Sequence, residues 1–226
     1  MTAKTVLIVA AHPDDEVLGC GGTMARRVED GDQVHVVFMA DGATSRSQPS
    51  DRGYIEERNT AALKACQILG AQTPEFLGFP DNRMDSIALL DVIQAIEKVI
   101  DKIQPTVVYT HHGGDLNVDH QITHQGVMTA CRPQPGVSVR EIYSFEVLSS
   151  TEWAAPSAAT VFVPNCFVDI EKVLDQKQSA LEAYNVEMRR FPHSRSIEAV
   201  VALATLRGVS VGMVAAEGFK IERLLL

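Results

Sequence analysis

Near the N-terminus a continuous aliphatic run, Thr5 to Ala10, leads directly into the polar segment Ala11-His12-Pro13-Asp14-Asp15-Glu16. An apolar run of this length without a polar interruption is typical of a strand that is covered on both faces. An imidazole and two adjacent carboxylates therefore stand where a buried strand ends. Such a segment can bind a divalent cation and still leave one carboxylate for proton transfer.

A second polar cluster, Asp115 to His120, follows another strand-like run, Thr106 to His111. Between the two clusters, apolar runs alternate with segments of helical spacing. We expect strands at 34–40 and 75–77, and helices at 22–30, 54–69 and 87–103. This order predicts an α/β fold, a Rossmann-like three-layer sandwich with a mostly parallel sheet. In the common strand order 3-2-1-4, the first and fourth strands are neighbours, so His12 and His120 are expected to lie together.

The pattern loosens after residue 140. It indicates strands at 141–147, 160–163 and 166–170, a helix from 171 to about 188, and a final helix. No internal repeat, low-complexity tract or linker is present, so we expect one domain over residues 1–226. The polar loops at 41–53 and 148–165 contain no motif that identifies a substrate.

Composition excludes several classes of protein. The net charge of −9 disfavours nucleic-acid binding. The four cysteines form no CxxC pair, as expected for reduced, mostly buried thiols in a cytoplasmic protein. No apolar run approaches the roughly 20 residues of a membrane span. The apolar segment 209–216 could cover a subunit interface in a homo-oligomer.

The residue types in the two clusters fit a catalytic zinc site, which typically keeps three protein ligands and one open position for water. His12 and Asp15 can supply two ligands and His120 the third, although this set also accepts other divalent transition metals. Asp14 could take the proton of the bound water. Gly19-Cys20-Gly21-Gly22 does not match a dinucleotide loop, and we interpret its small residues as a place where a helix packs closely.

Four motifs in order, AHPDDEVLGCGGT, ERNTAALKACQILG, LGFPD and DLNVDH, resemble the LmbE/PIG-L family of zinc-dependent N-acetylglucosaminyl-type deacetylases. The resemblance runs over most of the chain and is densest in the first 130 residues. It implies zinc on His12, Asp15 and His120, with Asp14 as the general base. The implied activity is a hydrolase that removes an N-acetyl group from an amino sugar or its conjugate and releases acetate.

The resemblance also implies that Arg58 and Asp81 meet hydroxyl or phosphate groups of the substrate. The alternatives are a surface ion pair of Arg58 with Glu56 or Glu57 and a capping role for Asp81. Arg195, with neighbouring arginines at 189 and 190, could recognise a phosphorylated sugar or could lie on a solvated basic turn.

The chain departs from the family at Asn117, where many relatives carry a histidine that stabilises the oxyanion or protonates the leaving amine. Asparagine can donate a hydrogen bond to an oxyanion but cannot deliver a proton. We favour His193 or His111 as the acid, and Asp14 could serve both roles. His112 is a further candidate, and His124 could be a ligand in place of His120, a supporting group or part of the helix surface.

Two other functions stay open. The chain could hydrolyse another N-acyl or N-formyl amide, or it could be a catalytically silent relative that binds a sugar or nucleotide.

Overall fold

The computed structural model describes residues 3–42 and 52–226, which form one seven-stranded sheet in the order β3-β2-β1-β4-β5-β7-β6. The strands are β1 (Thr5–Ala10), β2 (Gln33–Ala40), β3 (Glu75–Phe79), β4 (Val107–His111), β5 (Glu141–Phe145), β6 (Cys166–Asp169) and β7 (Ala216–Leu224). The helices are α1 (Asp15–Glu29), α2 (Arg52–Leu69), α3 (Leu89–Ile103), α4 (Val118–Ala130), α5 (Leu174–Ala183) and α6 (Ile197–Val209). Short 3₁₀ turns lie at Met84–Ser86, Thr151–Trp153 and Glu171–Val173.

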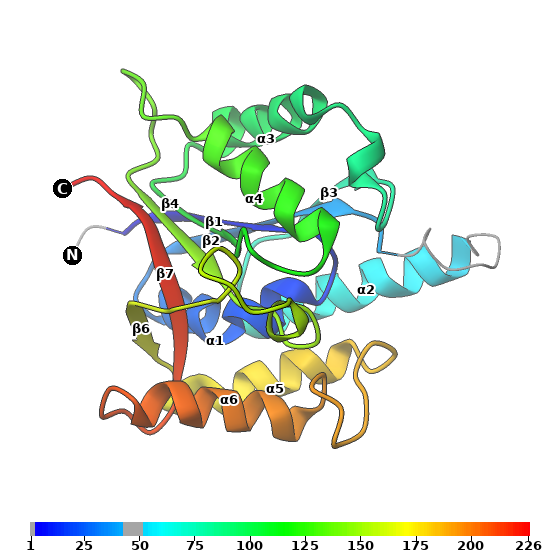
Figure 1. Cartoon of the computed structure of the whole chain (residues 1–226), viewed down its shortest axis with the longest axis vertical. Coiled ribbons are helices and arrows are strands. Elements are labelled where there is room, and N and C mark those ends of the chain that lie inside the picture. Colours follow the sequence, from blue (N-terminus) through cyan, green and yellow to red (C-terminus); the bar gives the residue numbers. More distant parts are fainter. Residues whose placement is uncertain (1–2, 43–51) are drawn as a thin grey trace.

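Helices cover both faces of the sheet (Figure 1). Helices α3 and α4 lie on one face, while α1, α2, α5 and α6 lie on the other. The strands from β3 to β5 pair in parallel, and β7 pairs antiparallel with both β5 and β6. The predicted α/β class, the mostly parallel sheet and the order 3-2-1-4 are confirmed.

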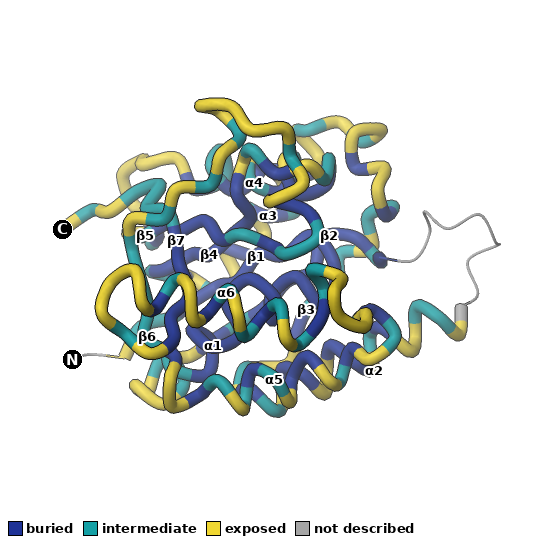
Figure 2. The backbone as a smooth tube through the Cα atoms, turned by 60° about the horizontal axis from the view of Figure 1, so that its bottom comes forward, coloured by how far each residue is buried: buried dark blue, intermediate teal, exposed yellow. Residues whose placement is uncertain are grey.

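The central strand β1 is covered on both faces, as its uninterrupted aliphatic run predicted. Val6 and Ile8 face the core that contains α1 and α2, while Leu7 and Val9 face the core that contains α3 and α4. All four side chains are at most 1% exposed, and the middle of the sheet is uniformly buried in Figure 2. Because β1 pairs in parallel with both β2 and β4, the segments that follow β1 and β4 emerge at the same edge.

Three predictions of secondary structure were wrong. The first helix begins at Asp15 instead of Gly22, and the predicted helix at 171–188 is a 3₁₀ turn followed by α5, which ends at Ala183. Residues 160–163 are not a strand, because β7 pairs at its outer edge with Cys166–Asp169 and the earlier segment pairs with no strand of the described residues. Strand β7 was missed; its mixed sequence AEGFKIERL, part polar and part apolar, gives only a weak period-2 signal.

The glycines in α1 lie where side chains would collide, as predicted for close packing. A Cβ atom at Gly19 would stand 2.2 Å from the Phe145 ring, and one at Gly22 would stand 2.8 Å from Ile170. Three of the four cysteines are buried, Cys166 is partly exposed, and all four are free thiols. Within 3–42 and 52–226, no helix is long and apolar enough to cross a membrane.

A buried ion pair supports α1 at an internal break. Cys20 has a non-helical φ of −148°, so the helix divides into two short pieces. The Lys177 ammonium donates to the Leu18 carbonyl at 3.0 Å, at the end of the first piece. The Glu217 carboxylate accepts the N–H groups of Gly22 and Thr23 at the start of the second piece, and it pairs with Lys177 at 2.6 Å. One ion pair therefore satisfies backbone groups on both sides of the break.

Replacement of Lys177 by Met is expected to lower the free energy of unfolding by about 3–5 kcal/mol, because it leaves the Glu217 charge buried without its partner. Denaturant unfolding measures this loss. The exposed pair Lys102–Glu75 is a matched control, and Lys102→Met should change stability by at most about 1 kcal/mol. Equal effects of the two substitutions would contradict this role of the buried pair.

Candidate metal centre and catalytic pocket

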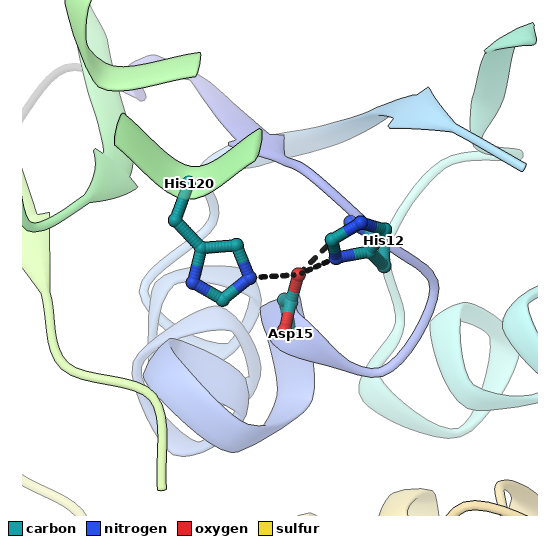
Figure 3. Close-up of side chains that lie close together, drawn as sticks. All are labelled: His12, Asp15 and His120. Carbon is teal, nitrogen blue, oxygen red and sulfur yellow. Dashed lines mark hydrogen bonds and ion pairs between the residues drawn. The ribbon is translucent and has the colours of Figure 1, made fainter. Parts of the chain in front are cut away.

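The ends of β1 and β4 bring His12, Asp15 and His120 together (Figure 3). The Asp15 Oδ2 atom lies 3.1 Å from His12 Nδ1 and 3.2 Å from His120 Nε2. The same oxygen accepts the backbone N–H of His12 at 2.9 Å, which closes the turn after β1. One ligand atom from each residue lies within 4.8 Å of the others, and all three residues are buried. The structure thus brings together the three residues that the sequence predicted as metal ligands.

The donor set fits a divalent metal. Two imidazole nitrogens and one carboxylate oxygen converge, and two-His-one-carboxylate sets of this kind bind zinc and other divalent transition metals. Burial would raise the pKa of Asp15, but His120 and His12 hold that pKa well below its usual value. The carboxylate is therefore ionised and available as a ligand.

Asp119 orients the first ligand, His12. The His12 Nε2 atom lies 3.0 Å from the Asp119 carboxylate, so Nδ1 is the nitrogen that faces Asp15. Asp119 in turn accepts the backbone N–H groups of Asn82 and Met84. Burial would lower the pKa of His12, but Asp119, Asp15 and Asp81 raise it well above its usual value. A second group with metal-binding spacing consists of His12, Asp81 and Asp119. In that group both Asp119 oxygens already accept hydrogen bonds from the backbone N–H groups of Asn82 and Met84.

His111 and Asp115 support the second imidazole, His120. The His111 ring stacks on the His120 ring with centroids 3.9 Å apart. Asp115 Oδ1 lies 3.1 Å from His120 Nδ1, although the angle does not make a good hydrogen bond. Asp115 also accepts hydrogen bonds from Ser150 and Thr151, which attaches the loop after β5 to the cluster.

Asp14 stands beside the cluster in an unusual backbone conformation. Its φ of 116° lies in the left-handed region, which non-glycine residues rarely adopt. Burial raises the pKa of Asp14 to about 6, while Arg195 opposes this rise. The Arg195 Nη1 atom lies 3.0 Å from Asp14 Oδ2, and Arg195 Nε donates to the Ser149 hydroxyl at 2.9 Å.

Arg58 is buried, so the alternative of a surface ion pair with Glu56 or Glu57 is wrong. Its guanidinium donates to the carbonyl of Pro13 at 2.6 Å and to that of Gly42, and it pairs with Glu187 at 3.2 Å. Asp81 is also buried, with Oδ1 3.1 Å from His12 Nε2.

Asn117 is the N-cap of α4. Its Oδ1 atom accepts the N–H of Asp119 at 2.8 Å, and its Nδ2 atom donates to Asn82 Oδ1 at 3.0 Å. The Asn117 side chain lines the pocket.

The remaining histidine candidates lie outside the pocket. His111 is fully buried, and its Nε2 accepts the N–H of Ala11 at 2.8 Å. Burial and His120 hold the pKa of His111 well below its usual value. His193 is exposed, with Nδ1 bound to the N–H of Arg195. His124 Nδ1 lies 2.8 Å from the His111 carbonyl, and His112 Nε2 lies 3.0 Å from the Thr160 carbonyl, so neither residue joins the metal-binding group.

The described residues enclose a polar cavity of about 200 Å³ above this cluster. It is lined by His12, Asp14, Asp15, Gly42, Arg58, Asp81, Asn82, Asn117, His120, Ser149, Ser150, Glu187 and Arg195. Sequence reasoning missed Glu187 and Ser149, because neither belongs to a motif or a periodic segment. Most of the predicted loop at 41–53 lies outside the described residues.

The mostly parallel sheet and the buried His-Asp-His group define the class of protein as an α/β enzyme with a candidate metal centre. A family model described as "PIG-L: GlcNAc-PI de-N-acetylase" matches residues 7–131. The chain is 33% identical to "Uncharacterized deacetylase YaiS" of Escherichia coli (strain K12), over 80% of this chain and 90% of the relative. The chain therefore belongs to the PIG-L family, as its motifs predicted.

Two further proteins show the range of reactions on this fold. The solved structure of N,N'-diacetylchitobiose deacetylase from Pyrococcus horikoshii matches with a TM-score of 0.78 and 22% identity, over 98% of this chain and 84% of that one. A Pseudomonas putida (strain KT2440) protein named "4-oxalmesaconate hydratase" is 29% identical over 79% of this chain and 72% of its own. Family membership alone therefore does not fix the reaction.

Replacement of Asp119 by Asn is expected to weaken zinc binding about 10- to 100-fold, because the charged partner of His12 is lost. Zinc titration against a competing chelator measures the change. His124→Gln is the matched control, since His124 lies near His111 but outside the group, and it should bind zinc as the unmodified protein does. Unchanged affinity in Asp119→Asn would show that Asp119 does not orient the ligand.

Proposed function

We propose that this protein is a zinc-dependent hydrolase that removes the N-acetyl group of an amino sugar or amino-sugar conjugate and releases acetate. The observation that carries the proposal is the position of Asp14, a buried carboxylate next to a His-Asp-His metal-binding group in a polar pocket. The family description names an N-acetylglucosaminyl substrate, which supports this substrate class.

The metal would be held by His12, Asp15 and His120, where it would acidify a bound water and polarise the amide carbonyl. Asp14 accepts the water proton as the nucleophile forms. Arg195 holds the Asp14 carboxylate at 3.0 Å and keeps it directed into the pocket. Asn117 donates its amide N–H to the oxygen that becomes negative when the carbonyl carbon is attacked.

The proton for the leaving amine comes from Asp14 in this proposal. His111 is an unsuitable acid because it is fully buried, has a lowered pKa, and uses Nε2 as an acceptor for Ala11. His193 is exposed and its Nδ1 is bound to the backbone of Arg195. Asp14 lines the pocket, and burial raises its pKa to about 6, so it can hold a proton and pass it to the amine.

The pocket favours a neutral polar group over an anionic one. Both of its arginines are already paired, Arg58 with Glu187 and Arg195 with Asp14. We therefore propose that Asp81, Asn82 and Arg58 meet sugar hydroxyl groups, and that Arg195 acts on Asp14 and does not bind a phosphate.

We further propose a cytoplasmic, single-domain protein that forms a homo-oligomer. Val209, Val211 and Val214 are 61%, 40% and 61% exposed, which supports an apolar contact between copies of the chain.

Product analysis over a substrate panel tests the function. The purified zinc-loaded protein should release acetate from N-acetylglucosamine or its glycosides. Release of formate alone would indicate an N-formyl amide, and hydration of an unsaturated dicarboxylate would indicate the reaction of the Pseudomonas relative. Zinc binding without turnover of any of these would support a silent binding protein.

Replacement of Asp14 by Asn is expected to lower kcat for acetate release about 10²- to 10⁴-fold, because the proton acceptor is lost while the side chain keeps its size. The zinc content should stay at that of the unmodified protein, because Asp14 is not a ligand. Acetate release and metal analysis on the same sample measure both. Normal turnover in Asp14→Asn would remove Asp14 from the mechanism.

A further inference from the structure

The peptide unit between Pro13 and Asp14 is held at both of its polar groups by buried side chains. The Asp14 N–H donates to Glu16 Oε2 at 3.0 Å. The Pro13 carbonyl accepts from Arg58 Nη2 at 2.6 Å. This peptide unit directly precedes the Asp14 Cα atom, so its orientation sets the left-handed φ of 116° at Asp14.

Each of these two groups is itself held by a second buried residue. Glu16 is fully buried, and its Oε1 atom accepts the Tyr184 hydroxyl at 2.6 Å. Arg58 Nη1 lies 3.2 Å from Glu187 Oε1. The Tyr184 side chain is likewise fully buried, so the contact between the Glu16 carboxylate and the Tyr184 hydroxyl is shielded from bulk solvent.

Both outer residues come from one tight turn after α5. The Glu187 N–H donates to the Tyr184 carbonyl at 2.8 Å, which holds the backbone positions of the two residues relative to one another. This turn lies about 170 residues further along the chain than Asp14, so a distant segment holds the motif residue Glu16 in place.

We propose that Glu16, Tyr184, Arg58 and Glu187 form a clamp on the Pro13–Asp14 peptide that holds Asp14 in its strained conformation and aims its carboxylate into the pocket. Left-handed backbone at a non-glycine residue persists only where surrounding contacts impose it. The residues of the clamp act through Asp14, so Glu16 and Tyr184 are positioning residues. The catalytic consequence rests on the proposed function, whereas the conformational consequence does not.

Tyr184→Phe removes one hydroxyl of the clamp and keeps the buried ring. It is expected to lower kcat about 10- to 100-fold, since small displacements of a catalytic group have effects of this size, while KM and zinc content stay unchanged. Tyr109→Phe is the matched control, because Tyr109 is also buried and its hydroxyl accepts from Arg27, away from the pocket. The control should lose stability without losing kcat.

Substitutions of Glu16 separate positioning from packing. In Glu16→Gln the amide oxygen can accept from Asp14 N–H while the amide nitrogen donates to the Tyr184 oxygen, so kcat should be close to that of the unmodified protein. Glu16→Ala removes both contacts, and its kcat should fall at least as far as in Tyr184→Phe. If kcat fell equally in Glu16→Gln and Glu16→Ala, and in proportion to a lower melting temperature, the positioning role of the clamp would be overturned.

Crystal structures of the unmodified protein and of Glu16→Ala give a readout that needs no activity. The clamp requires a left-handed Asp14 in the unmodified protein and a peptide that rotates away from it in Glu16→Ala. An Asp14 φ that stays near its original value in Glu16→Ala would overturn the proposal. If the protein hydrolysed no N-acyl amide, the proposed function would be wrong. The Asp14 φ in these two structures would still test whether the clamp holds Asp14.

Discussion

One oxygen atom, Oδ2 of Asp15, organises the site. It lies close to an imidazole nitrogen of both His12 and His120 and accepts the N–H that closes the turn after β1. This is possible because β1 and β4 are neighbouring parallel strands, so the segments that leave them start side by side. Asp15 and His120 are more than 100 residues apart in the sequence, yet their side chains lie within hydrogen-bond distance of one another.

The charges around this oxygen explain why the cluster suits a cation. Two arginines and the two candidate ligand histidines line the pocket. Six carboxylates line it too or contact its histidines: Asp14, Asp15, Asp81, Asp115, Asp119 and Glu187. Arg58 pairs with Glu187 and Arg195 pairs with Asp14, while Asp15, Asp81, Asp115 and Asp119 lie against the imidazoles of His12 and His120. Buried carboxylates need a counter-charge, and a divalent cation between His12, Asp15 and His120 would supply it.

The sequence predicted the parts of the site that depend on strand ends. His12, Asp15 and His120 follow continuous aliphatic runs, and the topology of parallel sheets then determines that they meet. Tyr184 and Glu187 could not be predicted, because they lie in a turn after α5 where neither periodicity nor a motif marks them. Strand β7 was missed for a similar reason: it enters the sheet antiparallel through pairing with β5, a long-range contact that its own mixed pattern does not show.

The pocket is built partly by residues at the ends of strands and partly by residues from later segments of the chain. The candidate metal-binding residues and the Pro13–Asp14 peptide are held by buried contacts with the sheet, α2 and the turn after α5. Ser149 and Ser150 also line the pocket, and they follow β5 on a loop attached to the cluster through Asp115. Loops on a rigid scaffold can change while the scaffold is kept. A buried centre in a pocket lined partly by a loop is consistent with the deacetylase and hydratase names that similar proteins carry.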